Sequence, residues 1–165
     1  MRHDDVREQL DYLAWVRDRV LTAAAALTDD EFRSSDTVTT RDLRGTLAHQ
    51  LECEWAWRVR LTEGAFPEGD VLPASFPTLA ALADRWGREA SELRLWFDRL
   101  SEGDLAASPP GPDSPLPTWR YLFYVVNHGT AQFAEAAVLL TRLGHSPGEL
   151  GYLAFCSRDE AGRSA

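Results

Sequence analysis

The sequence contains no lysine, so all 17 of its basic residues are arginines. This absence excludes catalysis through a lysine Schiff base and phosphate binding by a P-loop lysine. Acidic residues number 26, which gives a formal net charge of -9. Because nucleic acids and anionic membranes are bound through basic patches, we expect neither of them as a partner.

Cysteine and long apolar runs are also scarce. The two cysteines, Cys53 and Cys156, are far apart and form no CxxC pair, so neither a disulfide framework nor a zinc knuckle is indicated. The opening MRHDDVREQL has no apolar signal region, and no window approaches the run of about 18 apolar residues that spans a bilayer. A cytoplasmic location is therefore the default expectation.

Helical periodicity dominates the 165 residues, which are enough for a single domain over 1–165. Apolar residues recur at three- and four-residue steps over about 6–27, 43–63, 78–100 and 118–143, and no strand pattern is present. Asp42 and Gly64 suit the two ends of the second stretch. The pattern predicts an all-α, antiparallel four-helix bundle, to which 148–155 could add a short C-terminal helix.

Two proline-rich connections join these helices. The first, residues 64–77, is longer than usual and carries Phe66 and Phe76, so it could cover one end of the bundle. The second, SPPGPDSPLP at 108–117, is expected to form a rigid loop.

Histidines are the main candidates for chemistry, because the sequence has no HExxH or ExxH motif. By helical phase, Arg44, Glu54 and Arg58 share one side of the second helix, and His49 points to the opposite side. We therefore expect His49 to face inward, with Cys53 beside it. Taken alone, it is best interpreted as a core histidine that makes one hydrogen bond.

A second histidine lies on the fourth helix. His128, Gln132 and Glu135 share a face that borders the apolar arc, and Gln132 is turned slightly further inward. A structural role is again the simplest interpretation of His128. However, two histidines aimed at the interior from different helices favour a shared metal site, because bundles build metal sites in this way.

The other polar candidates are weaker. A buried free cysteine such as Cys53 is usually a small hydrophobe, although it could join His49 and His128 as a ligand. His3 and Cys156 fall in terminal segments, and His145 suits a helix C-terminus. The tryptophans are expected in the core, where some of them could wall a pocket: Trp55, Trp57 and Trp119.

Three segments carry a resemblance to a known family. LRGTLAHQLECEWAWRVRL at 43–61, VVNHGTAQFAEAAVLLTRLGHSPGEL at 125–150 and LDYLAWVRDRVLTAAAALTDDEF at 10–32 resemble the DinB-like (YfiT-like) superfamily of bacterial four-helix-bundle metalloenzymes. The combination of AH in the second helix, NHGT in the fourth and LGHSPG after it is fairly specific. The likeness extends over nearly the whole chain.

The resemblance implies a site of three histidines for zinc, nickel or a similar divalent metal. His49 and His128 match the first two ligands, whereas Gln132 stands at the third and Phe133 replaces an arginine that often follows it. A carboxamide oxygen is a poorer ligand than imidazole, so metal affinity should be lower than with three histidines. Cys53 or Glu135 are the possible substitutes for the missing donor.

The resemblance also implies an activity, a thiol-dependent transferase or isomerase that acts on a small molecule. Relatives use low-molecular-weight thiols such as bacillithiol or mycothiol, and the metal would lower the pKa of that thiol. They are commonly homodimers. The leading hypothesis is a metal-dependent protein with a His-His-Gln site. The alternative is a non-catalytic bundle that has lost its metal and serves as a ligand-binding or dimeric interaction protein.

Overall fold

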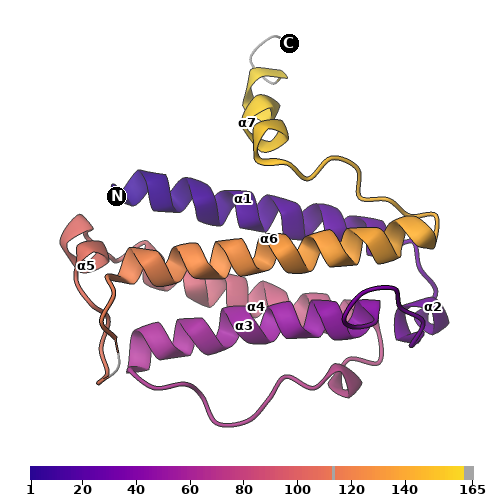
Figure 1. Ribbon diagram of the computed structural model, residues 1–165, viewed down its shortest axis with the longest axis horizontal. Helices are drawn as coiled ribbons and strands as arrows, with labels where there is room; N and C mark the ends of the chain where they lie inside the picture. Colours follow the sequence, from indigo (N-terminus) through magenta and orange to yellow (C-terminus); the bar gives the residue numbers. More distant parts are fainter. Residues whose placement is uncertain (113, 162–165) are drawn as a thin grey trace.

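The computed structural model describes residues 1–112 and 114–161, in which helices form and no strand does (Figure 1). It confirms the predicted four-helix bundle and the short C-terminal helix. The bundle helices are α1 (His3–Ala24), α3 (Leu43–Glu63), α4 (Leu79–Phe97) and α6 (Thr118–Arg142), and the smaller elements are α2 (Asp29–Arg33), the 3-10 helix η1 (Pro73–Ser75), α5 (Glu102–Ala106) and α7 (Tyr152–Ala161).

Local capping explains where α3 begins and ends, at the residues that the sequence indicates. The Asp42 carboxylate accepts the backbone N–H of Gly45 at 2.6 Å, and Gly64 adopts a left-handed φ of 84° that closes the helix. The single-turn helices α2 and α5 were not predicted, because five residues show no periodicity. Each begins with a capping box, formed by Thr28 with Glu31 and by Ser101 with Asp104.

The four long helices run in two parallel pairs. Figure 1 shows α1 and α6 running one way and α3 and α4 the other way. A connection between two parallel helices must return along the whole helix, which for the 21 residues of α3 is about 30 Å. Residues 64–78 therefore extend along α3, where the Val71 N–H donates to Glu52 at 3.2 Å, rather than covering one end of the bundle.

The core lies between the four helices, where the fully buried Trp86 of α4 stacks on the fully buried Phe133 of α6 with ring centroids 5.7 Å apart. The short α7 packs on α1 through Tyr12, whose ring centroid lies 5.3 Å from that of Tyr152 and 5.6 Å from that of Phe155. Asp113, in the second proline-rich loop, lies outside the described residues. Within the described ranges, no helix is both long and apolar enough to span a bilayer.

Candidate functional site

The fold brings the two candidate histidines together. His49 of α3 and His128 of α6 have ring centroids 5.2 Å apart, with the ring planes inclined at 66°. Both are half-buried, and 32% of the His49 side chain is exposed. The pair therefore lies at the edge of the bundle, where solvent or a small molecule can reach it.

Hydrogen bonds fix the tautomer of both rings. The His128 Nδ1 lies 2.8 Å from Oε1 of Gln50, and the His49 Nδ1 lies 3.4 Å from a carboxylate oxygen of Glu52. A carboxamide or carboxylate oxygen can only accept, so each Nδ1 carries the proton. Each Nε2 is left with a lone pair, which is the arrangement of metal-binding histidines whose other nitrogen is held by an outer partner.

A buried polar chain continues from His128 into the core. Nε2 of Gln50 donates to Glu54 at 2.9 Å, and the Trp86 indole N–H donates to the second Glu54 oxygen at 2.8 Å. Gln50 and Trp86 are fully buried, and Glu54 is 3% exposed. Burial raises the pKa of Glu54, while the charge of Arg17 and the two N–H donors act in the opposite direction.

The position of Glu54 corrects the expectation from helical phase, which put it with Arg44 and Arg58 on the side of α3 opposite His49. The structure buries Glu54 and leaves His49 partly exposed. Arg58 is also largely covered, because it forms an ion pair with the buried Glu89 of α4. Helical phase assigns polar side chains to solvent, whereas here partners on neighbouring helices hold them inside.

Glycine at position 129 leaves room for the side chains of Gln50 and Leu13 beside His128. A Cβ on Gly129 would lie 2.8 Å from Nε2 of Gln50 and 2.4 Å from Cδ1 of Leu13. Both distances are shorter than normal contacts, so any larger residue would push these side chains away. The glycine of the NHGT motif thus lets α3 and α1 approach α6 beside the histidine pair. The sequence does not single out Gln50, and the only feature that could have drawn attention to it is that it directly follows His49.

The third ligand position holds a buried oxygen that lacks a partner. Gln132 is 9% exposed, and its Oε1 has no hydrogen-bond partner among the described residues. The same is true of Oε2 of Glu135. In the described part of the chain, no three His, Cys, Asp or Glu side chains come together as a metal-binding group, so neither Glu135 nor Cys53 completes such a set with the two histidines.

Cys53 and His128 differ in their protonation at neutral pH, and therefore in their ability to bind a metal. Burial, followed by the charges of Glu54 and Glu52, raises the pKa of the Cys53 thiol to about 12, so it stays protonated and is a poor ligand at neutral pH. Burial also lowers the pKa of His128, and the nearby His49 and Arg41 add to this effect. His128 is therefore held in the neutral form, the one that offers a lone pair.

Aromatic side chains border the histidine pair on one side. The Tyr124 ring lies 6.0 Å from that of His128, and Trp57 lies 5.2 Å from both Tyr124 and Phe66. Trp57, Phe66 and Tyr121 line a cavity of about 350 Å³. Of the tryptophans expected to wall a pocket, Trp57 lines this cavity, and Trp119 lines another of about 430 Å³ together with Tyr124.

The remaining histidines lie elsewhere. His3 stacks on Phe97 at the start of α1, with ring centroids 4.3 Å apart. His145 follows α6, where its backbone N–H donates to the Leu140 carbonyl at 2.9 Å. Neither belongs to the group around His49 and His128.

Comparison with known proteins gives one finding. The model of the DinB family matches residues 1–161 of the chain. A search of curated proteins finds no match.

Proposed function

The chain belongs to the DinB family, and we propose that it is a metal-dependent protein whose divalent cation is held by His49, His128 and Gln132. The observation that carries this proposal is the pair of neighbouring imidazoles whose Nδ1 atoms both face acceptor oxygens. Two rings held in this way present two Nε2 lone pairs from facing helices.

The residues present fit such a cation. A buried acceptor without a partner is unfavourable, and a cation or a water bound to it would satisfy Oε1 of Gln132. Two imidazole nitrogens with one carboxamide oxygen form a weaker set for zinc or nickel than three imidazoles. The proposal therefore includes a modest affinity, with positions left open for solvent or substrate.

The proposed reaction is a thiol-dependent transfer or isomerisation, in which a low-molecular-weight thiol reacts with an electrophilic small molecule. When bound, the cation would lower the pKa of that thiol and polarise the electrophile. The chain's own residues would do the rest: Gln50 holds the His128 ring through its Nδ1–H, and Trp57 and Tyr124 provide an apolar wall beside it. An apolar wall would shield a reactive thiolate from water.

Metal titration of the purified protein tests the site. After treatment with a chelator, the protein is titrated with Zn²⁺ and with Ni²⁺ in a calorimeter. We expect binding that His49→Ala and His128→Ala each weaken at least about ten-fold. His145→Ala is the matched control, since it removes a histidine outside the site. No binding by the unaltered protein, or equal effects of all three substitutions, would contradict the proposal.

The substitution Gln132→His separates this function from the alternative of a bundle that has lost its metal. The observation that favours the alternative is Gln132 itself, in place of a third imidazole. Restoring the triad should raise the affinity for zinc. If the rate of thiol transfer, assayed with bacillithiol or mycothiol and a chromogenic electrophile, also rises, the enzyme is supported. A gain in metal binding without any thiol transfer would favour the ligand-binding or dimeric role.

A further inference from the structure

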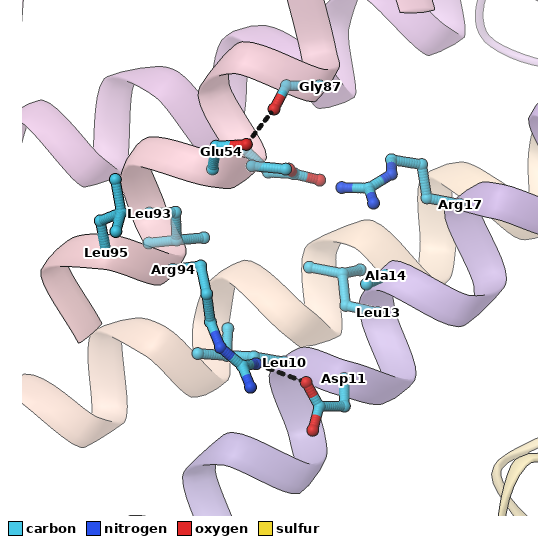
Figure 2. Close-up of a pocket in the computed structure, with 12 residues that line it drawn as sticks. Leu10, Asp11, Leu13, Ala14, Arg17, Glu54, Gly87, Leu93, Arg94 and Leu95 are labelled. Carbon is cyan, nitrogen blue, oxygen red and sulfur yellow. Dashed lines mark hydrogen bonds and ion pairs between the residues drawn. The ribbon is translucent and has the colours of Figure 1, made fainter. Parts of the chain in front are cut away.

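A second cavity lies between α1 and α4. It has a volume of about 550 Å³, within the range of ligand pockets, and none of its lining residues belongs to the proposed metal site. Figure 2 shows side chains of α1 and α4 on its two sides and Glu54 of α3 at its inner end. Its walls are mostly apolar and include Leu10, Leu13, Ala14, Ala90 and Leu93. We call this cavity the α1–α4 groove.

Two opposite charges meet at the inner end of the groove. Arg17 reaches from α1 toward Glu54 (Figure 2), and its side chain is only 15% exposed. Nε and Nη2 of Arg17 donate to Asp18, at 3.2 and 3.1 Å. Among the described residues, no ion pair joins Arg17 directly to Glu54, although its charge acts on that carboxylate. At the outer end, Asp11 and Arg94 neutralise each other at 2.5 Å.

The inner charges retain capacity for a ligand. Each oxygen of Glu54 accepts one N–H, from Gln50 and from Trp86, and a carboxylate oxygen can accept a second hydrogen bond. Both partners are donors, and they oppose the effect of burial, which raises the pKa of Glu54. Nη1 of Arg17 is not used in the bonds to Asp18.

Glycine at position 87 keeps the groove open. Gly87 lies in the middle of α4 and lines the groove, where glycine is unfavourable for a helix. A Cβ there would meet no atom within 4 Å. Packing within the protein therefore does not require glycine, and the open space it leaves faces the groove.

We propose that the α1–α4 groove binds a small zwitterion with an apolar side chain, such as an amino acid, whose ammonium group meets Glu54 and whose carboxylate meets Arg17. A cation alone would lie beside the guanidinium of Arg17, and an anion alone would lie beside the carboxylate of Glu54. Only a ligand with both charges satisfies the two groups, while its side chain displaces water from the apolar walls.

Three probes with the same aromatic body test the charge requirement: L-phenylalanine, phenethylamine and hydrocinnamate. Binding to the chelator-treated protein is followed by two-dimensional NMR of the N–H groups, in which the Trp86 indole N–H reports on Glu54. We expect L-phenylalanine to bind at least about ten-fold more tightly than either singly charged probe. Equal affinities, or no binding by any of the three, would overturn the proposal.

Substitutions place the binding site. Arg17→Gln and Glu54→Gln should each weaken L-phenylalanine binding about ten-fold or more, because each removes one charge. Gly87→Leu should abolish binding by filling the groove, whereas Gly87→Ala is the matched control that leaves most of it open. Undiminished binding by Gly87→Leu would overturn the proposal even if Glu54→Gln fails to fold. Because no metal is present, failure here is distinct from failure of the proposed metal site.

Discussion

Replacement of Gln50 by leucine is the sharpest test of the buried polar chain. The Gln50 side chain is fully buried and makes two hydrogen bonds, to Glu54 at 2.9 Å and to His128 at 2.8 Å. Leucine has a similar size, so it fills the space but offers no polar atom. Glu54 then keeps only the Trp86 N–H as a hydrogen-bond donor.

The cost follows from what each partner loses. A buried carboxylate that loses one N–H donor is destabilised by about 1.5–3 kcal/mol, and the half-buried His128, which can turn to water, by about 0.5 kcal/mol. We therefore expect Gln50→Leu to lower the free energy of unfolding by about 2–3.5 kcal/mol. For a chain of 165 residues this corresponds to a fall in Tm of about 4–14 °C.

Urea unfolding of the metal-free protein measures this cost, and Gln132→Leu is the matched control. Gln132 is also buried, but its Oε1 has no partner, so its replacement should change the free energy of unfolding by less than about 1 kcal/mol. The double variant Gln50→Leu/Glu54→Leu should recover much of the loss, because it removes the stranded carboxylate as well. Equal effects of the two single glutamine substitutions would refute the reasoning.

Three further predictions concern Glu54, Gly87 and the two cysteines. Because burial raises the pKa of Glu54 above its ordinary value of 4.5, its stabilising contribution is complete below that pH and is lost as the pH rises through the higher folded-state pKa. The stability of Glu54→Gln relative to the unaltered protein should therefore increase with pH, as measured by urea unfolding across a pH series, and a constant difference would contradict this. Gly87→Ala should raise the free energy of unfolding by about 0.5–1 kcal/mol, because the helix gains a better residue and a Cβ at this position meets nothing within 4 Å. With a chromogenic thiol reagent, the exposed Cys156 should react first, whereas Cys53, buried and with a pKa of about 12, should react only on unfolding; equal rates would contradict its burial.

The extent to which the sequence predicts the fold depends on how local the signal is. The ends of α3 follow from Asp42 and Gly64, whose effects lie within one turn of the helix. The direction of α4 relative to α3 has no such signal, although the length of the connection 64–78 is a consequence of it. The capping boxes that begin at Thr28 and Ser101 are local signals that could have revealed α2 and α5.

The sequence predicts the two histidines of the candidate site, but it does not predict the buried residues that hold them in place. His49 and His128 were singled out because two helices each carry one histidine within a family-like frame. Glu54 was assigned to the solvent side, since a lone glutamate on a helix usually lies there. Its burial depends on Trp86, Gln50 and Arg17, on three different helices, and such a combination appears in no local pattern.

Glu54 stands between the two proposed sites, and this position makes them separable by experiment. Gln50 connects it to His128, while its own carboxylate lines the α1–α4 groove. A change at Gln50 should therefore alter metal binding and stability while leaving the shape of the groove intact. A change at Gly87 should block the groove without touching the chain to His128. If Gly87→Leu nevertheless changed the zinc affinity, the two sites would communicate through Glu54 or through Leu13, which lines the groove and lies beside Gly129.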